Sequence, residues 1–202
     1  MKAYPRHRRG DLTPLLAETS EAWYWLGFFL ADGHITAAGN FTITIHEKDT
    51  KHIQQLADLL GCKVKRLKPI VIGGKERRHV RIETMDSATC AKIKDRLGLT
   101  LCRKTETPPS VAVLSKVDEY LFECLFIGFF DGDGSMRRKG YGQFGCHGNW
   151  KPIFELFEQR GLVRGTKINP RGRVCATVPV ATVTRLSEYD VPKMERKWNG
   201  FR

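Results

Sequence analysis

The chain has 202 residues, of which 41% are apolar and 10% are aromatic, so a chain that is disordered by composition is excluded. Lys and Arg number 34 against 22 Asp and Glu, which gives a formal net charge of +12. Such an excess indicates a polyanionic partner, because cations that neutralise phosphates release bound counterions.

The sequence carries no signal for a membrane span, for secretion or for a zinc site. Its longest apolar segments, 23–31 and 120–130, are shorter than the roughly 20 residues that cross a bilayer. The start, "MKAYPRHRRGD", is basic and is not followed by the apolar stretch of a signal peptide. The six cysteines form no CxxC pair and suit a reducing compartment. We therefore expect an intracellular protein.

Residues 1–17 are predicted to form a basic N-terminal arm, which either touches phosphates or is a disordered tail. The segment "EAWYWLGFFLADG" predicts the first helix, with Ser20 as its N-cap and Gly33 at the C′ position. This helix is apolar on nearly every face, so we expect it in the interior.

The elements after this helix are predicted in the order hairpin, helix, hairpin, helix. A turn at 39–40 and strict alternation over 41–45 predict the first hairpin. The segment "DTKHIQQLADLLG" predicts an amphipathic helix capped by Asp49. A second hairpin that turns at 73–74 and a helix near 86–97 follow.

The second half of the chain repeats this plan. Asp133 lies 101 positions after Asp32, and His147 lies 101 positions after His46. A capping box, "SKVD", opens the second apolar helix, "EYLFECLFIGFFDGDG". The remaining elements are a hairpin turning at 139–140, a helix capped by Asn149, a hairpin turning at 171–172 and a helix near 179–188. The offset between the copies falls to 93 at the end of the chain, so the second copy is shorter by about eight residues.

The sequence therefore predicts an α+β fold of two pseudo-symmetric αββαββα repeats with antiparallel sheets, at 18–108 and 109–202. Each apolar helix carries small residues four positions apart, and small residues let two helix backbones approach closely. We expect the two helices to pack together around a pseudo-two-fold axis, with the repeat interface formed by Gly27, Ala31, Gly128 and Gly132. Pairing of the halves within one chain predicts a monomer.

One face of the predicted strands is apolar, and the other carries Arg, Lys, Gln, Thr and His with few acids. Charge that merely solvates a half-polar sheet is the ordinary alternative. These side chains can bind base edges and phosphates, and two such sheets about a two-fold axis would follow the major groove of double-stranded DNA. The expected DNA-binding residues are Thr42, Thr44, His46, Lys65, Arg66, Lys68, Arg77, Arg78, His79, Arg81, Arg137, Arg138, Gln143, His147, Lys167, Arg171 and Arg173.

Two acids, Asp32 and Asp133, lie in an electrostatically unfavourable place, which is the same in both halves. An Asp in the last helical turn faces the negative end of the helix dipole, and two approaching carboxylates repel. A divalent cation would relieve both penalties, and oxygen ligands suit Mg²⁺, or Mn²⁺ in its place. A cation shared with DNA phosphates could activate water and stabilise the leaving 3′ oxygen. The alternative is that each Asp-Gly pair only makes a turn.

The segments "LGFFLADG" and "IGFFDGDG" resemble the two motifs of the LAGLIDADG homing endonucleases in their single-chain form, and the resemblance covers residues 18–202. It implies a saddle of two β-sheets on a long, pseudo-palindromic DNA site, with the motif helices between the halves. It further implies metal-dependent cutting of one strand at each motif acid, which gives a double-strand break with 3′ overhangs. The implied metal ligands are Asp32 and Asp133, with Ala31 and Gly132 beside them.

The resemblance also implies a basic residue near the end of each half, which holds the solvent network around the scissile phosphate. Lys104 and Lys197 occupy those places, next to Arg103 and Arg196. Where the family often has Gln, this chain has Glu47, which we expect to be catalytic.

The two motifs and their surroundings differ from each other. Leu30 stands where many family members have an earlier acid, while the second motif keeps Asp131. Gly148 stands at the repeat position of Glu47. We therefore expect unequal active sites, with one strand cut faster than the other.

Three other functions stay open. An intron RNA maturase of the same fold would have RNA as its partner, and a DNA-binding regulator would keep the fold without cutting. A basic α+β RNA-binding protein outside the family would leave the pair of motif acids unexplained.

Overall fold

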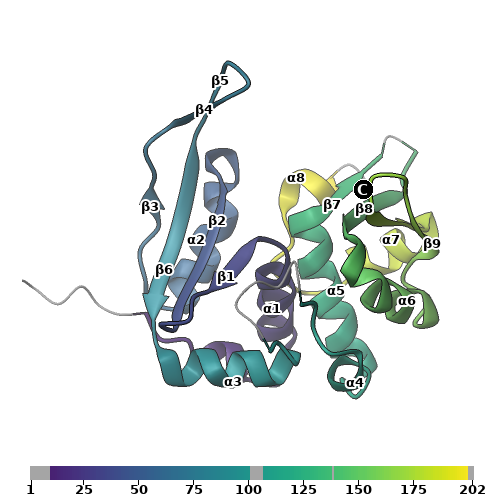
Figure 1. The fold of residues 1–202 in the computed structure, drawn as a ribbon, viewed down its shortest axis with the longest axis horizontal. Coiled ribbons are helices and arrows are strands. Elements are labelled where there is room, and N and C mark those ends of the chain that lie inside the picture. The colour runs from purple at the N-terminus through teal and green to yellow at the C-terminus, as the bar shows by residue number, and fades with distance from the viewer. Residues whose placement is uncertain (1–9, 101–106, 138, 200–202) are drawn as a thin grey trace, which may run out of the picture.

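A computed structural model of the chain describes residues 10–100, 107–137 and 139–199. Two halves stand on either side of a central pair of helices, α1 (Ser20–Asp32) and α5 (Glu119–Asp133) (Figure 1). Each half contains a four-stranded antiparallel sheet. The predicted α+β class with a repeated plan is confirmed.

The first half orders its sheet β1-β2-β6-β3 and carries a separate two-stranded ribbon, β4-β5. The strands are β1 (Gly33–Ile35), β2 (Asn40–His46), β3 (Lys65–Arg66), β4 (Ile70–Ile72), β5 (Lys75–Arg77) and β6 (His79–Met85). The other helices of this half are η1 (Thr13–Leu16), η2 (Glu47–Asp49), α2 (Thr50–Leu59) and α3 (Ser87–Leu97).

The second half has the equivalent order, β7-β8-β10-β9. Its strands are β7 (Gly134–Met136), β8 (Gly142–His147), β9 (Arg164–Ile168) and β10 (Arg173–Val178). Its other helices are α4 (Val111–Leu114), η3 (Gly148–Trp150), α6 (Lys151–Gln159), α7 (Val180–Ser187) and α8 (Glu195–Trp198).

Reciprocal contacts between α1 and α5 reveal the pseudo-two-fold axis. A Cβ atom added to Gly27 would lie 1.8 Å from the carbonyl oxygen of Leu125, and one added to Gly128 would lie 1.9 Å from that of Tyr24. Leu125 lies 101 positions after Tyr24, just as Gly128 follows Gly27. Each half therefore makes the same contact on the other, as a two-fold interface requires. The helices touch backbone to backbone, and neither position has room for a side chain.

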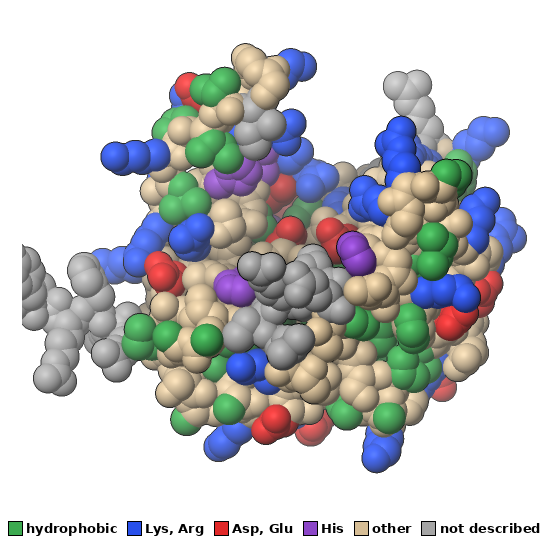
Figure 2. Space-filling model, viewed as in Figure 1, with side chains coloured by type: hydrophobic (Ala, Val, Ile, Leu, Met, Phe, Trp, Pro, Cys, Tyr) green, Lys and Arg blue, Asp and Glu red, His purple; other side chains and the backbone are tan. Residues whose placement is uncertain are grey.

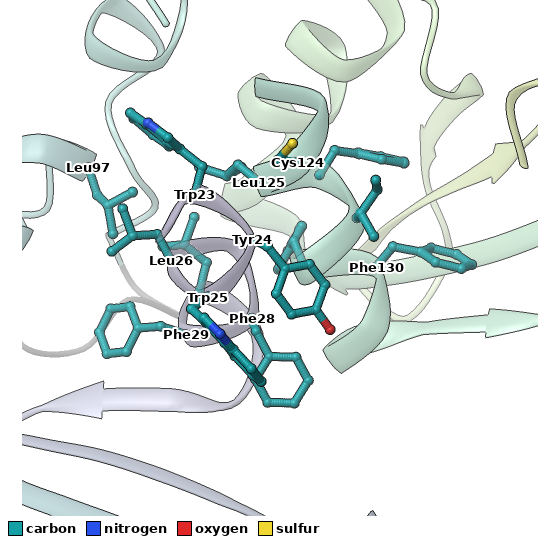
Figure 3. Packing of buried hydrophobic residues seen from close by; sticks show 14 of the residues in the cluster. Trp23, Tyr24, Trp25, Leu26, Phe28, Phe29, Leu97, Cys124, Leu125 and Phe130 are labelled. Atoms are coloured by element: carbon teal, nitrogen blue, oxygen red, sulfur yellow. The ribbon is translucent and has the colours of Figure 1, made fainter. Parts of the chain in front are cut away.

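Large apolar side chains surround this contact and form one core through both halves. Residues 22–30 of α1 and 122–131 of α5 are all buried, as expected for helices that are apolar on nearly every face. Figure 3 shows Tyr24 extending from α1 toward α5, with Trp25 and Phe28 packed near it. The rings of Trp25 and Phe28 meet edge to face, with centroids 5.8 Å apart. Within the described ranges, no helix has both the length and the apolar character needed to cross a membrane.

The caps of both central helices differ from the predicted ones. Thr19, not Ser20, is the N-cap of α1, and its hydroxyl accepts a hydrogen bond from the amide of Ala22 at 3.2 Å. Asp118, not Ser115, caps α5 and accepts from two amides of the first turn. A carboxylate is favoured there because it faces the positive end of the helix dipole.

Two histidines cap the elements that follow the first hairpins, in place of the predicted Asp49 and Asn149. Nδ1 of His46 accepts from the amide of Lys48 at 3.2 Å, and Nδ1 of His147 accepts from the amide of Asn149 at 3.3 Å. The helices α2 and α6 have no side-chain cap of their own. The two histidines therefore share one structural role, at the end of a strand in each half.

Part of the predicted N-terminal arm belongs to the first half instead. Leu12 and Leu15 are fully buried, and the amide of Asp11 donates to the carbonyl oxygen of Leu60 at 2.8 Å. The apolar pair anchors this segment on the core, so the folded half starts before residue 18. Residues 1–9 lie outside the described part of the chain.

The second hairpins differ in length between the halves. Fifteen residues separate Lys65 from Arg81, which pair across β3 and β6, whereas seven separate Lys167 from Cys175, which pair across β9 and β10. The surplus of eight equals Ile70–Arg77, the residues of β4, its turn and β5. Figure 1 shows this ribbon projecting beyond the rest of the first sheet.

Candidate active site

Each central helix ends on an acid, Asp32 in α1 and Asp133 in α5, and passes directly into a strand. Gly33 follows in an extended conformation, with φ −89°, so its predicted left-handed C′ role is wrong. A Cβ there would lie 2.1 Å from the ring of Phe29, and one at Gly134 would lie 2.3 Å from the equivalent ring of the second half. The glycines are needed for space, and the acids are fixed at the inner edge of each sheet.

The two acids open onto the concave surfaces of different halves. Asp32 lines a cleft of about 250 Å³ together with Thr44 and His79 of the first sheet. Asp133 lines a hollow of about 510 Å³ together with Gln143 of the second sheet. Each sheet thus has one motif carboxylate beside its polar face.

The ends of α1 and α5 also meet. A Cβ on Gly132 would lie 2.1 Å from the Cβ of Ala31 and 3.0 Å from Oδ2 of Asp32, so the Asp32 carboxylate lies against α5 next to Asp133. Carboxylate oxygens are hard ligands that suit Mg²⁺. Among the described residues there is no cluster of three His, Cys, Asp or Glu side chains that could hold a metal. A cation here would therefore take its other ligands from backbone oxygens, water or a bound phosphate.

Lys197 lies beneath the end of α5 and is almost fully buried. Its ammonium group donates to the carbonyl oxygens of Phe130 at 3.0 Å and Gly134 at 2.6 Å, and also to that of Asp131. These carbonyls belong to the negative end of the helix dipole, where a cation is favoured. Lys197 therefore holds the helix end that carries Asp133.

The charge of Lys197 also acts on both motif acids. Burial lowers the pKa of Lys197 to about 8, while the negative charges of Asp131, Asp32 and Asp133 oppose this change. The role that sequence analysis gave Lys197 toward a phosphate stays a prediction. Lys104 lies outside the described residues.

The polar contacts of Asp131 were not foreseen from the sequence. This carboxylate is completely buried and accepts hydrogen bonds from the Tyr24 hydroxyl at 2.8 Å, the Met194 amide at 2.8 Å and Nε1 of Trp198 at 2.7 Å. Burial raises the pKa of Asp131 to about 6, against the influence of the nearby Lys197 charge. An acid in the middle of an apolar helix was the available signal, because such a group must find partners.

The same network continues into the first half. Nε2 of His52 lies 2.9 Å from the Tyr24 hydroxyl oxygen, which must accept because its own proton goes to Asp131. Burial lowers the pKa of His52 to about 4, so the ring is neutral. Its Nδ1 atom has no hydrogen-bond partner among the described residues. A chain of buried polar groups thus joins α2, α1, α5 and the segment before α8.

Two ion pairs also join α8 to the first half. The Arg196 guanidinium contacts the Asp49 carboxylate through Nε at 2.6 Å and through a second nitrogen at 3.1 Å. Lys51 contacts Glu195 at 2.9 Å. Asp49 therefore serves as a partner for Arg196 rather than as the predicted cap of α2.

Glu47 directly follows β2 as the first residue of η2. Its carboxylate contacts Nε of Arg66 at 3.4 Å. The cleft that contains Asp32 is lined by His46 and Lys48 on either side of it, but Glu47 is not among the lining residues. The catalytic role predicted for Glu47 stays a prediction.

The predicted polar face of the first sheet is brought together by the strand register. Thr44 pairs with Arg81, His46 pairs with His79, and Lys65 pairs with Arg81 from the other side. Nε of Arg81 donates to the hydroxyl of Thr44 at 2.9 Å. Thr42 lies two residues before Thr44 on the same face, and the alternating residues of both strands are buried against the core.

Two of the predicted DNA-binding arginines lie on the other face. Arg66 pairs in register with the buried Val80, and strand alternation places Arg78 on the same side as Val80. Nε of Arg78 contacts the carboxylate of Glu76 at 2.7 Å, which fixes these two side chains on one face. Arg77 then lies on the opposite face. Arg66 and Arg78 are thus separated from the polar face that carries the other predicted DNA-binding residues, and their role stays a prediction.

The polar face of the second sheet surrounds the hollow that contains Asp133. Its lining includes Arg137, Gln143, Lys167, Arg171 and Arg173. Nε of Arg137 donates to Oε1 of Gln143 at 2.8 Å, and Arg173 donates to the carbonyl oxygen of Gly145 at 2.7 Å. His147 pairs in register with Arg173, Lys68 is exposed, and Arg138 lies outside the described residues. Figure 2 shows Lys and Arg side chains on both walls of the space between the halves, with acidic side chains at its floor.

The protein is similar to known proteins in its structure and not in its sequence. The sequence matches no protein-family model and no curated protein. The structure is similar to that of a lysine-to-alanine mutant of I-SmaMI, with a TM-score of 0.56 and 14% identity, over 88% of this chain and 87% of that chain. It is also similar to the LAGLIDADG meganuclease I-AabMI bound to uncleaved DNA, with a TM-score of 0.51 and 16% identity, over 87% of this chain and 86% of that one. The chain has the fold of the LAGLIDADG meganucleases.

Proposed function

We propose that the protein is a site-specific DNA endonuclease that acts as a monomer and cuts both strands of a long, pseudo-palindromic duplex. One observation carries this proposal: Asp32 and Asp133 meet where α1 touches α5, and each opens onto the polar, basic face of its own sheet. The similar fold of I-AabMI, which was solved bound to uncleaved DNA, supports a duplex as the ligand.

The two sheets supply binding. Arg81 and Lys65 in the first half, and Lys167 and Arg173 in the second, would contact phosphates and base edges on either side of the centre. The pseudo-two-fold axis passes between the motif acids. A duplex centred on this axis would place one strand at each acid. This arrangement favours one cut per carboxylate, and the resemblance to the LAGLIDADG homing endonucleases adds the expectation of 3′ overhangs.

The residues present fit a divalent cation, Mg²⁺ or Mn²⁺, at Asp32 and Asp133, with backbone oxygens near Ala31 and Gly132 close by. Such a cation supplies Lewis-acid stabilisation of the leaving 3′ oxygen and lowers the pKa of the attacking water. Lys197 positions Asp133 by binding the carbonyl oxygens at the end of α5, and its positive charge balances the two carboxylates.

A cleavage selection tests this function. The protein is incubated with a randomised duplex library and Mg²⁺, and the new ends are sequenced. We expect one family of sites cut near its centre, with no cutting by the Asp32→Asn/Asp133→Asn double variant or in the presence of EDTA. Cutting by the double variant would remove the catalytic assignment.

A binding selection with the same duplex library and a structured intron RNA as competitor separates the alternatives. Retention of specific duplexes without any cutting would indicate a DNA-binding regulator. Retention of a structured intron RNA in preference to all duplexes would indicate a maturase. Neither outcome would change the fold, but each would replace the proposed reaction.

A further inference from the structure

The β4-β5 ribbon, residues 70–77, makes the binding surface of the first half longer than that of the second. We propose that this ribbon is a DNA-contacting arm, so that the protein covers an asymmetric site whose half under the first sheet is longer at its outer end. This inference rests on the proposed function and names the substrate of that same surface more closely.

The length of the extension follows from the strand pairing. The hairpins of the two halves share the equivalent pairs Lys65–Arg81 and Lys167–Cys175, and the surplus beyond them is the eight residues 70–77. Four extra residues on each strand extend a hairpin by about 13 Å. Base pairs are about 3.4 Å apart along the duplex, so the first half can reach up to about four base pairs further from the centre.

Charge is segregated across the ribbon in a way that suits a phosphate backbone. Strand alternation places Lys75 and Arg77 on the face that continues the polar side of β6. Glu76 lies on the opposite face, where Arg78 contacts it at 2.7 Å. The acid of the ribbon is therefore both turned away and neutralised, and the cations that remain face the same side as His79 and Arg81.

The ribbon also exposes apolar side chains. Val71 is 73% exposed and Ile70 is 47% exposed, although neither belongs to a core. Ile70 pairs with Arg77 and lies on the face of the cations, whereas Val71 pairs with Glu76 and lies on the opposite face. Apolar side chains in the major groove contact thymine methyl groups, so the exposure of Ile70 fits an arm that lies against bases as well as phosphates. A ribbon of two strands is narrow enough to enter that groove.

The test compares binding selections from one randomised duplex library. Wild-type protein is compared with a variant that lacks residues 70–77, which gives the first hairpin the length of the second. We expect the wild-type consensus to extend further on one side of its centre, and the shortened variant to lose up to about four positions from that side only. A wild-type consensus of equal length on both sides, or loss from both ends, would overturn the inference.

A second pair of variants keeps the ribbon intact. Lys75→Gln/Arg77→Gln should reduce the slope of log affinity against log salt by about two on the selected site, because two phosphate contacts are lost. Arg78→Gln is the matched control, since its side chain lies on the other face, and its slope should equal that of wild type. Equal slopes for all three proteins would place the ribbon away from DNA.

Failure of the inference is distinct from failure of the proposed function. If wild-type protein selects no duplex, the proposed function fails and the asymmetric site fails with it. If wild-type protein selects and cuts a site, and the consensus selected by the shortened variant has the same length, only the inference about the ribbon fails.

Discussion

The hydroxyl of Tyr24 in α1 donates to the Asp131 carboxylate in α5 at 2.8 Å, so a buried hydrogen bond joins the two halves of the molecule. The pseudo-two-fold axis relates Tyr24 to Leu125 and Asp131 to Leu30, and both leucines are buried. The same place in the interface is thus polar on one side of the axis and apolar on the other. This difference is in line with the prediction that the two proposed active sites are unequal.

Asp131→Asn should destabilise the protein by about 3 kcal/mol. The carboxylate accepts from three donors, and an amide group would point its own NH₂ at one of them. Unfolding in urea, followed by circular dichroism, measures the change. Tyr24→Phe removes one of the three donors and should cost about 1 kcal/mol. A loss below about 1 kcal/mol for Asp131→Asn would show that the network contributes little.

Gly27→Ala and Gly128→Ala should each destabilise the protein by about 3 kcal/mol or more. The new methyl group would meet a backbone carbonyl oxygen at 1.8 Å or 1.9 Å, which forces α1 and α5 apart. Helix propensity alone would make Ala about 1 kcal/mol better than Gly, so any loss comes from the contact.

Gly61→Ala is the control for these two substitutions. Gly61 has a positive φ of 62° but no atom within 4 Å of an added Cβ. The substitution should destabilise the protein only through backbone strain, by about 1 kcal/mol. Urea unfolding of all three variants should therefore separate helix contact from strain, and equal losses at Gly27 and Gly61 would contradict close contact between the helices.

Asp32→Asn and Asp133→Asn, as single variants, should each cut only one strand of a selected site, and the two variants should leave opposite strands intact. The reason is that each carboxylate opens onto the sheet of its own half. Duplexes labelled on either strand and separated on a denaturing gel give the measurement. Binding affinity should be retained in both variants. Equal slowing of both strands by either variant would indicate one shared centre instead of one acid per strand.

His52 should make the protein less stable in acid. Its pKa lies near 6.5 in an unfolded chain and at about 4 in the folded protein, because burial disfavours the charged ring. Between these values the unfolded chain binds a proton that the native state does not, so unfolding becomes easier as pH falls from about 7 to 4. Above pH 7 the ring is neutral in both states and has no such effect.

Comparison with His52→Gln isolates this contribution. An amide group can still donate to the Tyr24 hydroxyl but does not titrate. Between pH 7 and 4.5, wild-type protein should lose roughly 2 kcal/mol more than the variant in urea unfolding. Parallel stability curves for the two proteins would show that the pKa of His52 is the same in the folded and unfolded states.

Local patterns in the sequence were sufficient to predict much of the fold. The offset of 101 between Asp32 and Asp133, and the glycines at Gly27 and Gly128, predicted two buried helices in contact. Alternation in the strands predicted that one face is apolar, and burial of Val80 and Ile82 in β6 agrees with it. These features depend on neighbours in the chain, which is why a pattern can show them.

Other features depend on pairs that are distant in sequence. The side chains of Ser20 and Thr19 can both cap a helix. The direction in which the chain enters α1 decides between them, and the sequence does not show this direction. Asp49 looked like a cap, but its partner Arg196 is 147 positions away. Asp131 was recognised as an acid that only the second motif keeps, yet nothing in the sequence pointed to Tyr24 or Trp198 as its donors.

The order of elements along the chain also has a consequence for how the protein is made. Trp198 and Lys197 secure the end of α5, yet they follow Asp131 by 67 and 66 positions. During synthesis the second motif helix therefore leaves the ribosome well before its final supports exist. The end of α5, which carries Asp133, can therefore reach its final packing only after α8 has emerged and docked.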